Sequence, residues 1–111
     1  MKKNEFSDST IFNINHSIEY SSGGVVSKQI IQRKVGNVTL FAFDKGQQLS
    51  EHTAPFDALI NVIDGTGEII IDKKPFTLQA GESIIMPANI PHAVNATQKF
   101  KMVLTMIKHL E

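Results

Sequence analysis

Two stretches of the sequence decide the fold: residues 46–65 are GQQLSEHTAPFDALINVIDG, and residues 81–95 are GESIIMPANIPHAVN. Each begins with a glycine, continues into a run rich in β-branched residues and contains one histidine, His52 in the first stretch and His92 in the second. Glycine adopts a positive φ that most residues avoid, so both glycines are typical of turns. Short β-branched runs between turns indicate strands. The two stretches therefore predict compact β structure with one histidine in each half.

The same pattern continues on both sides of these stretches. Predicted strands cover residues 25–33, 38–43, 58–63, 68–71, 76–78, 83–86, 93–95 and 100–107. Turn residues separate these runs, including Asp64-Gly65-Thr66-Gly67 between the third run and the fourth. Short strands at regular spacing with no helical run between them favour an antiparallel sandwich or a closed barrel. The predicted fold class is all-β.

The N-terminal residues 1–24 differ from this β pattern. Ile11, Ile14 and Ile18 are three and four residues apart, which predicts a short helix within residues 11–20 that Asn13 or Asn15 would cap. We therefore expect two parts, a leader of residues 1–24 and a barrel of residues 25–111. The leader is expected to cover one sheet of the barrel.

Composition limits the function. A chain of 111 residues forms a single domain. Its 11 basic and 11 acidic side chains balance, so a nucleic acid is not an expected partner. The absence of cysteine excludes disulfides, cysteine-based zinc sites and thiol nucleophiles.

The ends of the chain suggest its location. No apolar stretch approaches the roughly 20 residues that cross a membrane, and residues 1–10 are polar, so we expect a cytoplasmic protein without a membrane partner. Leu110 and Glu111 match a dipeptide that often precedes a purification tag, and we expect no function of them.

The spacing of the two quoted stretches resembles the paired motifs of the cupin superfamily. Six positions of the family pattern are in register: Gly46, His52, Gly65, Gly81, Pro87 and His92. Asn89 stands where the second motif has glycine, a substitution that keeps the left-handed backbone accessible. The resemblance covers about residues 38–107 and implies a double-stranded β-helix, the cupin jelly-roll barrel.

The resemblance also bears on metal binding. Metal-binding cupins take three ligands from the first motif and one from the second, but here Ala54 replaces the second histidine and Ala58 replaces the glutamate. His52 and His92 are the family ligands that remain. A stable site for zinc or non-haem iron normally has at least three protein ligands. Two interpretations stay open, namely no cofactor, or a divalent ion (Zn, Ni, Fe or Mn) held by His52 and His92.

The histidines also predict a ligand-binding pocket. In an alternating strand Gln48 and His52 share the inward face. We expect a small polar or carboxylate-bearing molecule to bind there. The predicted ligand-binding residues are Gln48, His52, Met86, His92 and Met106. Further apolar lining is expected from Phe41, Phe43, Ile60, Met102 and Leu104.

Three functional hypotheses follow. The first is a small-molecule-binding cupin of unassigned activity, and the second is a metal-dependent oxygenase or sugar-type isomerase that uses His52 and His92 as metal ligands. The third is a structural dimer with a filled barrel. Met86 and Met106 also suit Cu(I), although methionine more often fills gaps in a core. A homodimer is expected because strands such as residues 59–63 are apolar on both faces.

Overall fold

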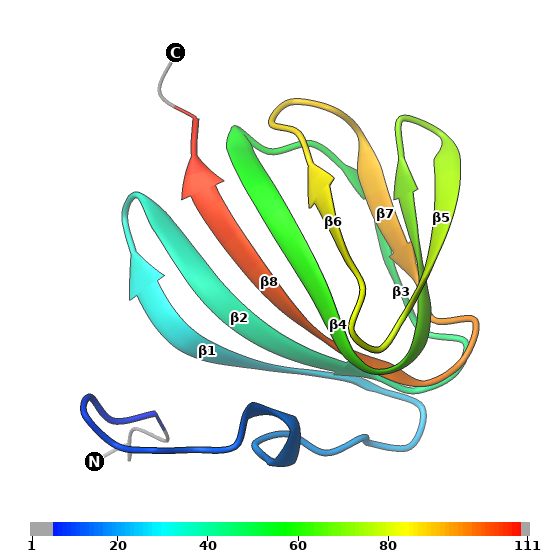
Figure 1. The fold of residues 1–111 in the computed structure, drawn as a ribbon. Coiled ribbons are helices and arrows are strands. Elements are labelled where there is room, and N and C mark those ends of the chain that lie inside the picture. Colours follow the sequence, from blue (N-terminus) through cyan, green and yellow to red (C-terminus); the bar gives the residue numbers. More distant parts are fainter. Residues whose placement is uncertain (1–5, 110–111) are drawn as a thin grey trace.

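The computed structural model describes residues 6–109, which are almost entirely β structure (Figure 1). The elements are the 3₁₀ helix η1 (Ile14–His16) and the strands β1 (Val25–Arg33), β2 (Gly36–Phe43), β3 (Gln48–His52), β4 (Phe56–Ile71), β5 (Lys74–Gln79), β6 (Ser83–Met86), β7 (His92–Asn95) and β8 (Phe100–Lys108). Each predicted run lies within one of these strands. The expectation for Leu110 and Glu111 falls outside the described residues.

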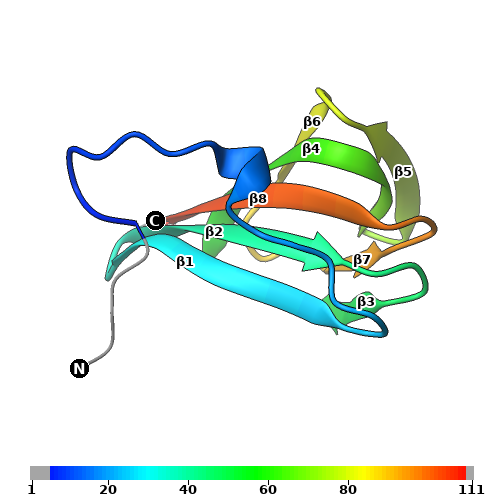
Figure 2. The same cartoon turned by 90° about the horizontal axis from the view of Figure 1, so that it is seen from below.

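Two antiparallel sheets share the long strand β4. One sheet has the order β1-β2-β8-β4-β6, and the other has the order β5-β4-β7-β3. The first half of β4 pairs with β8 and β6, and its second half pairs with β5 and β7. The strands curl over one another in both views (Figures 1 and 2). The predicted all-β jelly-roll barrel is confirmed.

The segment Asp64-Gly65-Thr66-Gly67 is not a turn, and this prediction was wrong. It lies inside β4, where the pairing with β8 shifts register between Val62 and Asp64. A Cβ atom on Gly65, whose φ is +74°, would overlap the carbonyl oxygen of Lys99. A Cβ atom on Gly67 would come within 2.6 Å of the Phe100 ring. These glycines are needed because the start of β8 passes close to the bend in β4.

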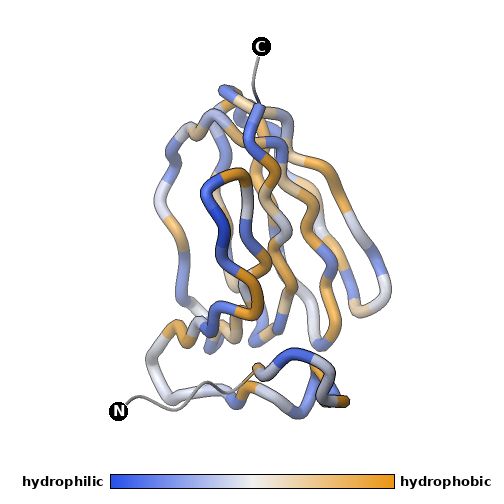
Figure 3. Tube along the Cα trace, turned by 90° about the vertical axis from the view of Figure 1, so that its left-hand side faces the viewer, coloured by the Kyte–Doolittle hydropathy of each residue, from blue (hydrophilic) through white to orange (hydrophobic). Residues whose placement is uncertain are grey.

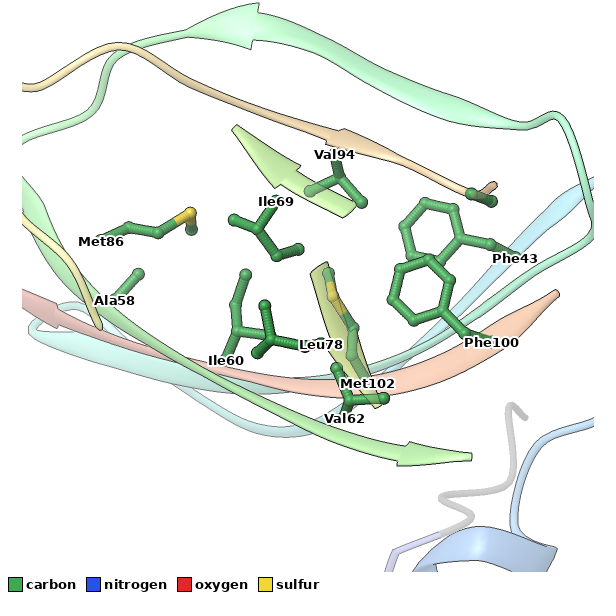
Figure 4. Close-up of a cluster of buried hydrophobic side chains, with 11 residues drawn as sticks. Phe43, Ala58, Ile60, Val62, Ile69, Leu78, Met86, Val94, Phe100 and Met102 are labelled. Atoms are coloured by element: carbon green, nitrogen blue, oxygen red, sulfur yellow. The ribbon is translucent and has the colours of Figure 1, made fainter. Parts of the chain in front are cut away.

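The barrel interior is an apolar cluster with two different ends. Hydrophobic and hydrophilic residues alternate along the strands (Figure 3), which places every second side chain inside. At one end the rings of Phe43 and Phe100 stack with centroids 4.8 Å apart and an interplanar angle of 4°. Ala58 and Met86 lie at the opposite end (Figure 4). Both ends belong to one continuous core.

The leader covers the outer face of the first sheet, as expected (Figure 2). Phe6 and Ile18 are buried against Leu40, Ala42 and Val103, which form a second apolar cluster. The Tyr20 hydroxyl donates a hydrogen bond to the Asp64 carboxylate, which ties the end of the leader to β4. Burial, and then that hydrogen bond, raise the pKa of the tyrosine.

The predicted leader helix is reduced to a single 3₁₀ turn. Asn13 caps the turn, since its side-chain oxygen accepts a hydrogen bond from the backbone N–H of His16 at 3.1 Å. Lysines from the barrel bind the carbonyls that follow: Lys101 Nζ donates to Asn15 at 2.7 Å and Lys28 Nζ to Ser17 at 2.8 Å. These carbonyls therefore accept hydrogen bonds from lysine side chains of the sheet and not from the backbone of a further helical turn.

Some apolar side chains stay exposed outside the leader's footprint. Leu59, Ile85 and Ile107 lie on β4, β6 and β8 of the first sheet. They are compatible with the expected homodimer, which stays a prediction. The described residues contain no helix whose length and apolarity would carry it through a membrane.

Candidate functional site

The two motif histidines meet at one end of the barrel. His52 ends β3 and His92 begins β7, and the two residues are direct cross-strand partners. Their Nε2 atoms are 3.2 Å apart, and their ring centroids are 4.4 Å apart at an interplanar angle of 69°. His92 is buried, whereas His52 is exposed. The pair therefore connects the barrel interior to its surface.

Backbone carbonyls orient both rings. His52 Nδ1 lies 2.7 Å from the carbonyl oxygen of Ser50, and His92 Nδ1 lies 3.2 Å from that of Ile90. A carbonyl oxygen only accepts hydrogen bonds, so each Nδ1 carries the proton and donates. In a neutral ring the proton on Nδ1 leaves a lone pair on Nε2. Both Nε2 atoms therefore face the space between the rings, at a separation that a single shared proton accounts for.

Burial favours the neutral form of His92. Its pKa is lowered, mainly because burial removes water from the charged ring, and the nearby His52 ring lowers it further. The hydrogen bond to the Ile90 carbonyl acts in the opposite direction. The neutral ring offers Nε2 as an acceptor or as a ligand.

The expected inward position of Gln48 is wrong. Leu49 pairs with Val94 and His52 pairs with His92, so β3 contains one more residue than β7 between these two pairs. This bulge changes the phase of the strand, and His52 shares the inward face with Leu49. Gln48 is exposed and outside the cavity.

A cavity of about 40 Å³ lies beside the histidine pair. Besides the two imidazoles its lining includes Leu49, Phe56, Ala58, Met86, Leu104 and Met106. The structure thus brings Met86 and Met106 together with both histidines, and a ligand-binding role for the four stays a prediction. Phe56 was missed, although it is in phase with Ala58. Phe41 and Phe43, expected in the lining, lie at the opposite end.

The loop of the second motif holds the site together. Asn89 has a φ of +65°, as expected for the position where the family pattern has glycine. Its backbone N–H donates to the carbonyl of Ala54 at 2.8 Å. Asp57 is outside the cavity lining, and its carboxylate accepts from the Ala88 N–H at 3.0 Å. The two motifs are therefore joined by hydrogen bonds at the site.

A family model described as a cupin domain matches residues 39–108, which are most of the barrel. The chain belongs to the cupin superfamily. No curated protein sequence matches it.

Solved structures agree with this family. A conserved protein of unknown function from Streptococcus pyogenes is 30% identical, with a TM-score of 0.90 over 97% of this cupin and 95% of that chain. A cupin 2 conserved barrel domain protein from Leptotrichia buccalis is 46% identical with a TM-score of 0.85; the match covers 87% of this cupin but 47% of that longer chain. A salicylate 1,2-dioxygenase from Pseudaminobacter salicylatoxidans is 12% identical, with a TM-score of 0.69 over 77% of this cupin and 26% of that chain, and shares the fold.

The residues at the site do not fit the divalent metal centre that the family implies. Ala54 and Ala58 have no donor atom, and the rest of the cavity lining is apolar. Within residues 6–109 no group of three or more histidine, cysteine, aspartate or glutamate side chains is placed to hold a metal ion. Two imidazoles fall short of the three protein ligands that zinc or non-haem iron sites normally use.

Proposed function

We propose that this cupin binds a small molecule in the cavity beside His52 and His92. The observation that carries the proposal is the convergence of two imidazole rings on the edge of an apolar cavity. Ligand sites commonly combine apolar walls with a few well-placed polar groups. A carboxylic acid can pass its proton to one imidazole, whose Nε2–H then donates a hydrogen bond to the carboxylate.

The cavity limits the size of the ligand. Its volume of about 40 Å³ exceeds the roughly 10–15 Å³ that one water molecule requires, but is far below the roughly 300–1,000 Å³ of a drug-sized pocket. Only a few non-hydrogen atoms fit inside. A larger ligand would extend past His52, which is exposed, toward the solvent. Compact carboxylic acids suit this shape.

Ligand-observed NMR on chelator-treated protein tests the proposal, with acetate, glycolate and pyruvate as probes. We expect at least one probe to bind, and the His52→Ala variant to weaken its binding by about tenfold or more, equivalent to roughly 1.4 kcal/mol. His109→Ala is the matched control, because His109 is exposed and contacts Asp57 outside the cavity. Equal binding by the His52→Ala variant, or no binding of any probe at millimolar concentration, would refute the proposal.

A further inference from the structure

The histidine pair has an arrangement that an electron-pair acceptor would stabilise. Both Nδ1 atoms face backbone carbonyls, so the two Nε2 atoms point at each other across 3.2 Å, a separation that one shared proton, or a metal ion in its place, accounts for. Facing lone pairs repel unless a positive centre lies between them. Ligating histidines typically donate the other ring N–H to a backbone carbonyl or carboxylate, as both rings do here. The geometry is therefore that of two ligands.

Two methionines supply further donor atoms at the same end of the barrel. Ala58 of β4 pairs with Met86 of β6 on one side and with Met106 of β8 on the other. Side chains that are direct cross-strand partners have Cβ atoms about 4.5–5.5 Å apart, so the Cβ atoms of both methionines flank the alanine. All three residues line the cavity with both imidazoles. Two methionine side chains therefore border the cavity on either side of the position where the family pattern has glutamate.

This donor set selects a particular kind of metal ion. Imidazole nitrogen together with thioether sulfur suits Cu(I), whereas Cu(II) prefers tetragonal nitrogen and oxygen ligands. Two metal–nitrogen bonds of about 2.0 Å that meet near the tetrahedral angle span roughly 3.2–3.3 Å. The Nε2 atoms are separated by 3.2 Å, which matches. The cavity of about 40 Å³ has room for a single ion.

We propose that this cupin binds one Cu(I) ion through His52 Nε2, His92 Nε2 and the thioethers of Met86 and Met106. This inference goes beyond the proposed function, because small-molecule binding needs no metal. It also follows from the misfit described above: the residues that are too few for a divalent ion are sufficient for a soft monovalent one. The exposed His52 ring provides the route by which the ion enters.

Anaerobic competition with the Cu(I)–bicinchoninate complex measures this affinity, and zinc, nickel and manganese are titrated in parallel. We expect one Cu(I) per chain, bound at least about 100-fold more tightly than any of the divalent ions. X-ray absorption of the loaded protein is expected to show both nitrogen and sulfur bound to copper. The His52→Ala variant should lose the tight binding.

Methionine variants decide whether sulfur takes part. Methionine-to-leucine changes nearly conserve volume, so the folded state should persist, which thermal melting verifies. The double variant Met86→Leu/Met106→Leu should weaken Cu(I) binding by about tenfold or more. Met102→Leu is the matched control, because Met102 also lines the cavity but pairs with Val62, four residues from Ala58 along β4.

Two outcomes would overturn the copper proposal: Cu(I) affinity unchanged in the folded double variant, or zinc bound as tightly as Cu(I). Neither outcome affects the probe binding of chelator-treated protein, so a failure of this inference is distinguishable from a failure of the proposed function.

Discussion

The two ends of the barrel interior are built from the same strands but filled in opposite ways. At the closed end β2 and β8 contribute the stacked rings of Phe43 and Phe100, and Gly67 of β4 packs directly against the Phe100 ring. At the site end β4 contributes Ala58, and a cavity remains beside the histidines. Stacked rings therefore fill one end, and the small side chain of Ala58 leaves a cavity at the other.

This difference indicates that stability and binding depend on different ends of the barrel. Burial of aromatic rings provides much of the free energy of a small core, and tight packing there tolerates no added atoms. The site end loses some of that packing, because a cavity removes contacts from the side chains around it. We infer that the closed end stabilises the fold and that the site end is free to bind.

Gly65→Ala should have the largest effect on stability. A Cβ atom at this position overlaps the backbone carbonyl of Lys99, and the φ of +74° disfavours any side chain. The two penalties together should reduce the free energy of unfolding by about 3 kcal/mol or more, as measured by chemical denaturation.

Gly46→Ala is the control for that variant. Gly46 has a φ of +90°, but a Cβ atom there meets nothing within 4 Å. It should carry only the conformational cost, roughly 1–2 kcal/mol. If both variants lose the same free energy of unfolding, the close approach of the Lys99 carbonyl is not the reason that glycine occupies position 65.

The contrast between the ends also shows what the sequence was able to predict. The spacing from Gly46 to His52 and from Gly81 to His92 resembles the paired cupin motifs, and this resemblance was enough to predict the barrel and the meeting of the two rings. Period-two alternation placed Ala58 and Met86 inside, since β4 and β6 alternate without interruption there. Regular strands were therefore predictable from local pattern.

The errors fall where pairing between strands overrides that pattern. The bulge in β3 replaces Gln48 by Leu49 on the inward face, and nothing in residues 48–52 alone indicates an extra residue, which is defined by the partner strand β7. Gly65 and Gly67 suggested a turn because glycine is common in turns, but Lys99 and Phe100, distant in sequence, leave no room for a Cβ atom at either position. Both features depend on long-range contacts.

Ala58→Glu should convert the site end into a divalent metal site with a moderate loss of stability. The new carboxylate would join His52 and His92 as a third ligand, which is enough for zinc. Without metal, a carboxylate at a position only 4% exposed should reduce the free energy of unfolding by about 2 kcal/mol. Zinc at about 100 times its Kd should return roughly 2.7 kcal/mol.

Thermal melting with and without zinc measures the loss of stability and its recovery. Ala58→Val is the control, because it fills the same space without a donor and should show no stabilisation by zinc. Equal responses of the two variants to zinc would mean that the side chain at position 58 does not reach the space between the imidazoles.

Variants of Asn89 should have the smallest effect on stability. They test whether the positive φ at the site end has a different cause from the glycines at the closed end. Its φ of +65° is the feature that the loop requires, while its N–H to the Ala54 carbonyl is a backbone contact that any residue except proline retains. Asn89→Gly should therefore change the free energy of unfolding by no more than about 0.5 kcal/mol, and Asn89→Ala should cost about 1 kcal/mol, because alanine tolerates the left-handed region less well than asparagine. Denaturation of the two variants in parallel measures the difference. A larger loss of unfolding free energy in Asn89→Gly than in Asn89→Ala would show that the asparagine side chain itself holds the loop. The site end would then depend on a side chain, whereas the closed end depends on glycines that have none.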